Sequence, residues 1–178
     1  LTGQASLYYK YGQTFNDRVG IEALFTTGDA DGAADDKYNG VVTGNVWGSP
    51  VGIYSSHRAF LLFPDAQVIN RYYSAVHDIS NLGYGTSAVF LNYFRDIVPN
   101  TMSLKLGAAA ALANETPQFG GNVIGYEANA ELKYNYKVFL TFGLHAAYIV
   151  PGDFYDSPLV RNTEQIPLAP WVMFASVS

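Results

Sequence analysis

Apolar and polar residues alternate along the stretch from Tyr126 to Val150, with one interruption near its middle. Up to Tyr136, even-numbered positions carry apolar or aromatic side chains, and the odd-numbered positions between them carry Glu, Asn or Lys. The apolar even-numbered series resumes at Val138 and continues to the end of the stretch. A period of two indicates a β-strand with two chemically different faces. The stretch therefore predicts two strands joined by a short turn, each about twice the usual five or six residues long.

The same alternation recurs along the chain and predicts seven strands, at residues 2–12, 18–28, 86–96, 101–113, 123–135, 138–150 and 170–178. The connections between successive strands alternate in length. Short connections follow the first, third and fifth strands. Long connections follow the second, fourth and sixth strands, at 29–85, 114–122 and 151–169. In an antiparallel up-and-down sheet, this alternation places every long connection at the same end.

Long strands with tight turns at one end and long loops at the other are typical of β-barrels in the bacterial outer membrane. We therefore predict an all-β fold, a transmembrane antiparallel up-and-down β-barrel. Residues 1–178 would form a single domain, with a long extracellular loop at 29–85. Soluble β-sandwiches and lipocalin-like barrels also alternate and are the alternative folds, but they give no reason for long loops at only one end.

The two faces of the predicted strands differ in chemistry. The apolar face would contact lipid, because a charge there costs about 2–4 kcal/mol at the bilayer midplane. Tyrosines and a tryptophan fall near the strand ends, where amphipathic rings favour the membrane interface. The polar face would line the barrel interior. It carries the predicted lumen-lining residues Lys10, Arg18, Glu22, Lys105, Glu127, Asn129, Glu131, Lys133 and His145.

Composition agrees with a membrane partner and argues against nucleic acid. Of the 178 residues, 49% are hydrophobic and 14% are charged, against a usual charged share of about 25%. The net charge is −5, so no basic surface is available to neutralise phosphates. The chain has no cysteine, which excludes disulfides and thiolate metal sites. The expected partners are the lipid bilayer and lipopolysaccharide of the outer membrane, and a small solute or oligosaccharide.

Seven strands cannot close as an ordinary antiparallel barrel, because the first and the last run in the same direction. Bacterial single-chain barrels have even strand numbers. We therefore expect these residues to form part of a larger barrel, with 2–12 and 170–178 as two open edges. An additional strand inside 47–83, around Gln67 to Val76, is the alternative that would close a small barrel of eight strands.

Four stretches share a texture with one family: VGIEALFTTGDADG, AFLLFPDAQVINRYY, LKLGAAAALANE and GYEANAELKYNY. In strand texture and loop placement, the chain resembles the C-terminal part of alginate-export-type outer-membrane porins. The resemblance implies a large barrel that passes anionic polysaccharide or small solutes. An exporter of an acidic polymer is expected to have an arginine-rich lumen, whereas the predicted lumen positions mix lysine and arginine with glutamate. We therefore expect passive passage of small solutes or oligosaccharides.

The 29–85 connection is longer than a simple link requires, since loops above about 12–15 residues are usually functional or disordered. Its many aromatic and aliphatic residues argue against disorder. One hypothesis is an inward-folded constriction, with Arg58 and Arg71 as anion contacts; the other is a loop on the barrel rim or against a partner protein. Two functions follow: a passive channel, and a structural barrel that anchors a surface assembly or a partner protein. Small residues at 107, 109, 111 and 113 favour the channel.

Residues that could carry chemistry are few. Four aspartates cluster at the start of the longest connection: Asp29, Asp31, Asp35 and Asp36. Oxygen ligands at this density suit Ca²⁺, and a solvated acidic turn is the alternative. The three histidines belong to no HExxH or paired metal-ligand spacing, and no GxSxG motif is present. We therefore predict no catalytic residue and no enzyme activity, with calcium as the single candidate cofactor.

Overall fold

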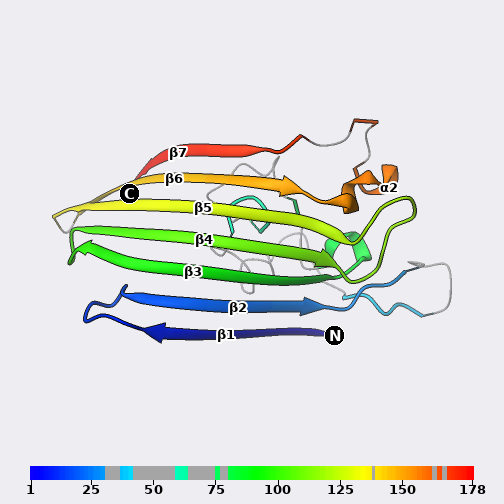
Figure 1. Ribbon diagram of the computed structural model, residues 1–178, viewed down its shortest axis with the longest axis horizontal. Helices are drawn as coiled ribbons and strands as arrows, with labels where there is room; N and C mark the ends of the chain where they lie inside the picture. Colours follow the sequence, from blue (N-terminus) through cyan, green and yellow to red (C-terminus); the bar gives the residue numbers. More distant parts are fainter. Residues whose placement is uncertain are drawn as a thin grey trace.

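The computed structural model describes residues 1–30, 37–41, 59–63, 75–76, 80–137, 139–161, 164–165 and 168–178. Within these residues, seven strands form one antiparallel sheet in the order of the sequence (Figure 1). The strands are β1 (Thr2–Lys10), β2 (Arg18–Thr26), β3 (Thr86–Val98), β4 (Met102–Ala113), β5 (Val123–Tyr136), β6 (Leu140–Pro151) and β7 (Trp171–Val177). Short helical turns lie in the connections: η2 (Asn81–Gly83), η3 (Asp153–Asp156) and α2 (Pro158–Arg161). No helix among the described residues is long and apolar enough to cross a membrane.

All seven predicted strands are present, and each boundary agrees with the prediction within two residues. β1 ends at Lys10 because the chain turns there: the backbone N–H groups of Tyr11 and Gly12 both donate to the carbonyl oxygen of Asp17. The two tightest turns each contain a non-glycine residue with a positive φ, Asn100 at 61° and Lys137 at 58°. Local turn chemistry thus fixes where the long strands stop.

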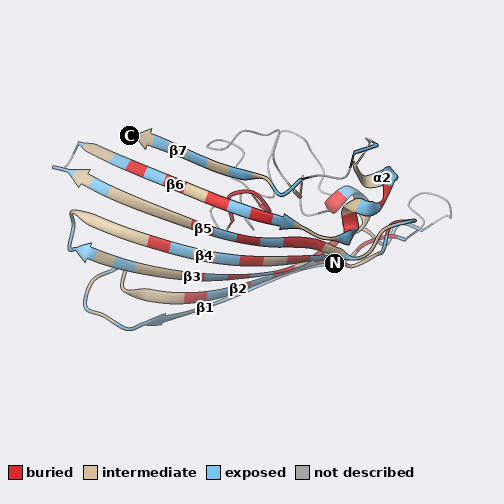
Figure 2. Ribbon diagram, turned by 45° about the horizontal axis from the view of Figure 1, so that its top comes forward, coloured by how far each residue is buried: buried red, intermediate tan, exposed pale blue. Residues whose placement is uncertain are grey.

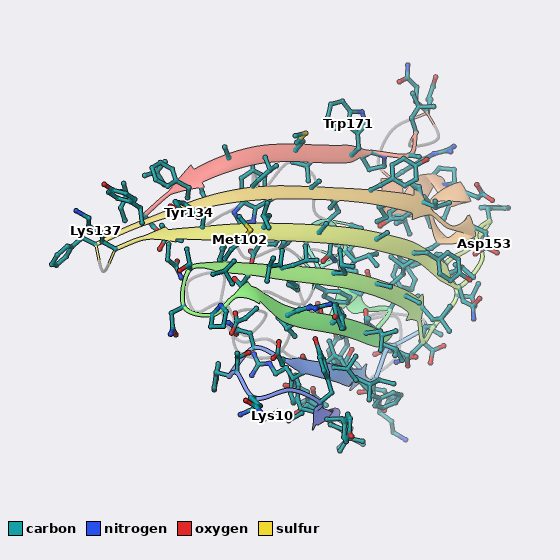
Figure 3. All side chains as sticks on the ribbon, turned by 60° about the vertical axis from the view of Figure 1, so that its left-hand side comes forward. Lys10, Met102, Tyr134, Lys137, Asp153 and Trp171 are labelled. Atoms are coloured by element: carbon teal, nitrogen blue, oxygen red, sulfur yellow. The ribbon has the colours of Figure 1, made fainter. Side chains whose placement is uncertain are left out.

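The two ends of the sheet differ as predicted. The turn end carries the tight connections after β1, β3 and β5, and the loop end carries the long connections after β2, β4 and β6. Figure 3 shows Lys137 at the turn end and Asp153 at the loop end. At the loop end, the Asp153 carboxylate accepts a hydrogen bond from the backbone N–H of Val123 at 2.8 Å. The connection after β6 is therefore joined to the start of β5.

The sheet is open, with β1 and β7 at its two edges (Figure 1). The expected pair of open edges is confirmed, since β1 pairs with β2 and β7 pairs with β6. The described strands do not close into a barrel. The additional strand considered around residues 67–76 falls mostly outside the described residues. Ala75 and Val76, which are described, donate backbone hydrogen bonds to Leu61 and Leu62 at 2.9 and 3.1 Å.

The two faces of the sheet are covered to very different extents (Figure 2). We call the face that packs against residues 59–63 the covered face; it carries Glu22, Lys105, Glu127, Asn129 and His145, all of them buried. We call the opposite face the bare face. Its large apolar side chains are exposed in all seven strands, for example Leu91 at 51% and Leu106 at 45%.

The hydrophobic core lies between the covered face and the connecting segments, mostly toward the loop end. Residues 59–63 supply much of it, and all five of them are buried. Alanines on β4 leave room for this segment, because Ala109, Ala111 and Ala113 face it with small side chains and are themselves buried. Phe63 packs edge-on against Phe90 of β3, with ring centroids 5.2 Å apart. The apolar core and the buried polar residues therefore lie side by side on the covered face.

Candidate functional site on the covered face

Strand pairing places one residue from every strand in a single row across the covered face. The row comprises Lys10, Arg18, Phe94, Lys105, Glu131, His145 and Phe174. A second row, closer to the loop end, contains Glu22 on β2 and Glu127 on β5. Strand pairing thus brings charged and aromatic residues into shared rows, although they are far apart in the sequence.

Glu127 binds the 59–63 segment through its carboxylate. One oxygen accepts the backbone N–H of Phe60, and the other accepts those of Leu61 and Leu62 at 2.8 and 2.7 Å. The amide of Asn129 donates to the first oxygen at 2.9 Å. Hydrogen bonds to a charged acceptor are stronger than those between neutral groups. A carboxylate that is only 3% exposed therefore holds three consecutive backbone groups of the long connection against the sheet.

Further contacts attach the same segment on both sides. The Lys105 ammonium lies 5.0 Å from the centroid of the Phe60 ring, an attractive cation–π arrangement. At the loop end, the link is indirect: the backbone N–H of Ala75 donates to Leu61 at 2.9 Å, and the carbonyl oxygen of Ala75 accepts the Tyr155 hydroxyl at 2.6 Å. Burial raises the pKa of Tyr155 above its ordinary value, so the hydroxyl keeps its proton and remains a donor. The segment is thus fixed to β4, β5 and the turn η3.

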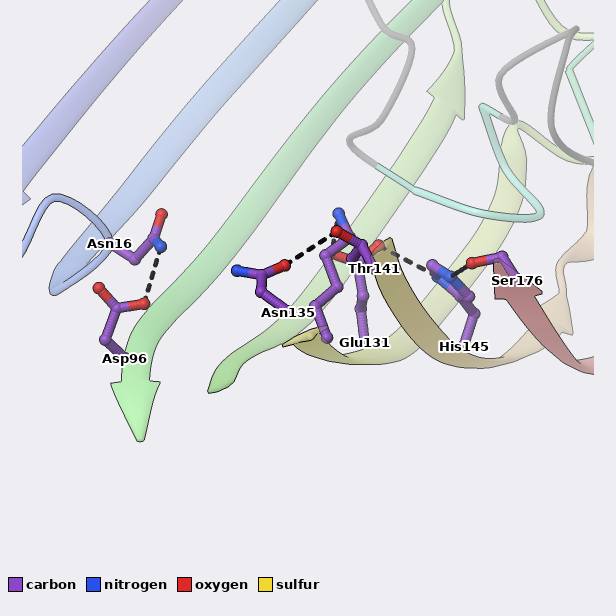
Figure 4. Close-up of polar contacts among 8 residues, drawn as sticks. Asn16, Asp96, Glu131, Asn135, Thr141, His145 and Ser176 are labelled. Atoms are coloured by element: carbon purple, nitrogen blue, oxygen red, sulfur yellow. Dashed lines mark hydrogen bonds and ion pairs between the residues drawn. The ribbon is translucent and has the colours of Figure 1, made fainter. Parts of the chain in front are cut away.

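His145 links three strands through both nitrogens of its ring (Figure 4). Nδ1 lies 3.0 Å from a carboxylate oxygen of Glu131 on β5, and Nε2 lies 2.9 Å from the hydroxyl of Ser176 on β7. The ring stacks on Phe174 with centroids 4.4 Å apart and planes inclined by 8°. The second oxygen of Glu131 pairs with the Lys133 ammonium at 2.8 Å. The ring orientation is therefore set by contacts on both of its nitrogens and on one of its faces.

Arg18 occupies an aromatic environment near the turn end. Its guanidinium carbon lies 5.3, 5.1 and 4.7 Å from the ring centroids of Tyr8, Phe15 and Phe94. The Tyr8 hydroxyl in turn donates to the carboxylate of Glu22. Arginine stacks well on aromatic faces because its planar cation is weakly hydrated. This part of the covered face therefore presents a positive charge with little freedom to move.

The predicted lumen residues all lie on the covered face, but they differ in burial. The buried ones are Glu22, Lys105, Glu127, Asn129 and His145, and their assignment to the lining of a barrel lumen stays a prediction. Arg18, Glu131 and Lys133 are half-buried, and Lys10 on the edge strand is exposed. Alternation predicts the face on which a side chain lies, but it contains no information about a segment that folds back over that face.

Several predicted residues lie outside the described residues: Arg58, Arg71, Asp31, Asp35 and Asp36. Asp29 is described and buried, and its carboxylate accepts the backbone N–H of Asn39 at 2.9 Å. Among the described residues, no group of three or more His, Asp or Glu side chains could hold a metal ion. The calcium hypothesis and the anion contacts of the two arginines therefore stay predictions.

Sequence reasoning missed Ser176, Gly143 and the role of Glu127 as a backbone acceptor. Period-two alternation places Ser176 on the same face as Phe174, which is a usable signal. The pairing of Gly143 with Ser176, and hence the approach of Ser176 to His145, depends on the register between β6 and β7. That register follows from the length of the preceding connection, and the sequence pattern alone does not specify it.

Comparisons with known proteins give no match: no family model, no curated protein and no solved structure matches this chain. The resemblance to alginate-export-type porins therefore stays a prediction.

Proposed function

We propose that this chain forms part of the wall of a transmembrane β-barrel in the bacterial outer membrane. It would act there as a porin-like channel for passive passage of small solutes or oligosaccharides. The observation that carries the proposal is the bare face, where large apolar side chains are exposed across all seven strands. Soluble proteins rarely expose contiguous apolar patches above a few hundred Å², and larger patches mark a protein or membrane contact.

The distribution of charge on the strands supports a lipid contact. Of all charged residues in the seven strands, only Arg95 lies on the bare face, and it is near the turn end. The rows across the middle of that face carry only Leu, Ile, Val, Ala, Met, Tyr and Trp, as in the row Leu7, Ile21, Leu91, Ala108, Ala128, Tyr148 and Trp171. A charge at the membrane centre costs about 2–4 kcal/mol but little near the interface. The position of Arg95 is therefore consistent with a membrane-spanning wall.

Aromatic residues on the bare face gather toward the two ends of the strands. Tyr9, Tyr93 and Tyr134 lie toward the turn end, with Tyr126 and Tyr148 toward the loop end. Tyr11 stacks on Tyr93 with ring centroids 5.6 Å apart. Tyrosine and tryptophan favour the boundary between lipid and water, because one part of the ring is apolar and the other is polar. In β5, Tyr134 and Tyr126 lie toward opposite ends of the strand, with Leu132, Ala130 and Ala128 between them on the bare face.

A channel would need additional strands to complete the wall, since the described sheet is open at β1 and β7. Barrels of about eight strands are filled by their side chains, whereas those of 16–18 strands contain an aqueous channel. The 59–63 segment on the covered face would then narrow the lumen from one side. The packing of the 59–63 segment on the covered face also supports the second function, a filled barrel that anchors a surface assembly or a partner protein.

Conductance across planar bilayers tests the channel and separates the two functions. We expect the complete protein, after insertion, to give discrete conductance steps. Glu127→Gln should increase the step size, because the backbone N–H groups of residues 60–62 would lose a charged acceptor and the segment would leave the wall more often. Inserted and folded protein that gives no steps would overturn the channel and leave the anchoring function. A lack of insertion into bilayers would overturn both.

A further inference from the structure

We propose that Ser176 is a nucleophile activated by His145, and that the covered face cleaves short-chain carboxylic esters by acyl transfer to water. The three side chains concerned, Ser176, His145 and Glu131, come from the adjacent strands β7, β6 and β5 (Figure 4). This activity is separate from solute passage, because it requires only the folded strands and a solute that reaches them.

The carboxylate of Glu131, the imidazole of His145 and the hydroxyl of Ser176 lie in the sequence that activation of a serine by a base requires. A neutral imidazole with its proton on Nδ1 donates to Glu131 over 3.0 Å and accepts the Ser176 hydroxyl proton at Nε2 over 2.9 Å. Nucleophile, base and orienting acid within hydrogen-bond distance recur on unrelated folds and are recognised by geometry. Ser176 and His145 would be the catalytic residues, and Glu131 would be a positioning residue.

Gly143 makes the approach of the serine to the histidine possible. It lies directly between Lys133 and Ser176 in the strand register, next to His145 on the covered face. A Cβ at this position would come within 2.5 Å of the Ser176 hydroxyl and 2.6 Å of His145 Nε2. A side chain at this position would therefore clash with both atoms that would react, so their close approach requires glycine here.

The imidazole is held as firmly as a positioned base requires. Phe174 stacks on one side of the ring, and Phe60 meets it edge-on with centroids 5.9 Å apart. His145 is only 6% exposed, while Ser176 is half-buried and open to an approaching solute. Glu131 is itself restrained by Lys133 at 2.8 Å. These contacts reduce the motion that would separate the base from the hydroxyl.

The reaction would proceed in two balanced stages. The Ser176 oxygen bonds to the ester carbonyl carbon while its proton moves to His145 Nε2; the carbon–alkoxy bond then breaks, and the alcohol leaves with that proton. Water repeats the sequence on the acyl-serine, releasing a carboxylic acid and restoring the hydroxyl. Backbone N–H groups in the paired strands are engaged in the sheet. Lys133, two strands from Ser176 in the same row, would instead stabilise the oxyanion through its charge.

The surroundings define the class of ester. Even a Cβ at position 143 would crowd Ser176 and His145, so we expect only a small acyl group, such as acetyl, to fit beside the two residues. Phe174 offers an aromatic surface beside it, and Lys133 is partly exposed and positively charged. We therefore expect a short acyl ester carried on a polar solute.

Labelling with a fluorophosphonate tests the nucleophile, because this reagent modifies only activated serines. The full chain is folded in detergent micelles, labelled, and mapped by peptide mass spectrometry. We expect the label on Ser176, and none on Ser176→Ala or on heat-denatured protein. Ser103→Ala is the matched control: Ser103 also lies on the covered face, paired with Lys133 but away from His145, and its loss should leave labelling unchanged. Folded protein that takes no label at Ser176 overturns the proposal.

Three further variants test the roles of His145 and Glu131 in protein whose circular dichroism shows intact folding. His145→Gln should lower the labelling rate by about 10²-fold or more, the usual contribution of a general base. Glu131→Gln should also lower it, and Glu131→Asp should restore part of the rate because it keeps the charge. Unchanged labelling in His145→Gln overturns the activation by His145. p-Nitrophenyl acetate should be turned over by the native chain, and labelling without turnover would overturn ester cleavage.

Discussion

The covered face and the bare face are made by the same seven strands, yet they place opposite kinds of residue in opposite environments. On the covered face, charged residues such as Glu127 and Lys105 are buried and engaged by hydrogen bonds or aromatic rings. On the bare face, large apolar residues such as Leu106 and Leu144 are exposed. In a soluble sheet, the exposed face is ordinarily the polar one.

This inversion is the one expected for a sheet whose bare face contacts an apolar medium, as the proposed function requires. On the covered face, Glu127 and His145 are hydrogen-bonded within the protein, which offsets the loss of their hydrogen bonds with water. Apolar groups on the bare face are exposed instead. A lipid environment would satisfy them, and four changes would break or sharpen the contrast between the two faces.

The largest effect is expected for a charge placed on the bare face. Leu106→Arg, near the middle of β4, should lower the free energy of folding into lipid by about 2–4 kcal/mol, because the guanidinium would enter the membrane centre. Leu112→Arg, on the same face but near the loop end, should cost only about 0–1 kcal/mol. Urea-dependent refolding into lipid vesicles measures both.

The covered face supplies the control for that experiment. Ser103→Arg introduces the same side chain on the opposite face of β4, where other cations already lie. It should leave folding into vesicles nearly unchanged. Equal losses for Leu106→Arg and Leu112→Arg, or no loss for either, would show that the bare face does not contact lipid.

The next effect concerns the covered face. Glu127→Ala removes the acceptor for three backbone N–H groups and for the Asn129 amide. We expect a loss of about 1–3 kcal/mol, since buried donors without partners carry a penalty of this size. Hydrogen exchange at Leu61 and Leu62 should rise in the same variant. Glu131→Gln is the comparison: it alters the partly exposed ion pair with Lys133 and should change stability by less than about 1 kcal/mol. A larger loss in Glu131→Gln than in Glu127→Ala would contradict the role of Glu127 as the acceptor that holds the 59–63 segment.

A smaller effect is expected for a methyl group added beside His145. Gly143→Ala should destabilise the protein by about 1 kcal/mol, because the new Cβ would crowd Ser176 and His145. Gly3→Ala is the matched control on edge strand β1, where a Cβ would meet no atom within 4 Å. Thermal unfolding should separate the two variants. An equal change in the unfolding temperature of both variants would mean that Ser176 moves aside without a loss of stability.

The smallest effect lies at the turn end, outside both faces of the strands. Backbone N–H groups of Asp96 and Thr14 donate to the Asp17 carboxylate, and they hold its pKa below the ordinary value of 3.8. The stabilisation is therefore complete above pH 3.8 and is lost only as the pH falls through the lower pKa of the folded state. Hydrogen exchange at Asp96 should accelerate in that acidic range. Asp17→Asn should abolish this pH dependence, and acceleration near neutral pH would contradict the assignment.

The sequence predicts the strands and their faces well because both depend on local alternation. Each side chain in a strand points to the face opposite its neighbours, so Lys105 and Leu106 are separated correctly without knowledge of any partner. The alternation of short and long connections likewise predicts the strand order. These properties need only the spacing of residues along the chain.

The contacts of the candidate site depend on distant residues and were not predictable in the same way. Glu127 meets Leu61 across 66 positions of sequence, and no pattern near either residue marks the other. His145 was assigned correctly to the polar face, but its approach to Ser176 follows from the register of two strands separated by a long connection. Buried polar contacts of this kind are set by the tertiary structure.

The alternation of connection lengths also has a consequence for the order of folding. β5 and β6 pair from Tyr136 and Leu140 onward, whereas the hydrogen bond between Thr26 and Thr86 that joins β2 to β3 spans 60 positions. Each doubling of loop length adds about 0.6 kcal/mol to the free-energy cost of closing the loop. Forming the β2–β3 contact therefore costs roughly 2 kcal/mol more than forming the β5–β6 hairpin. Hairpins can form within about 1–10 µs. The chain would therefore assemble from preformed hairpins, and the contact between β2 and β3 would be among the last to close.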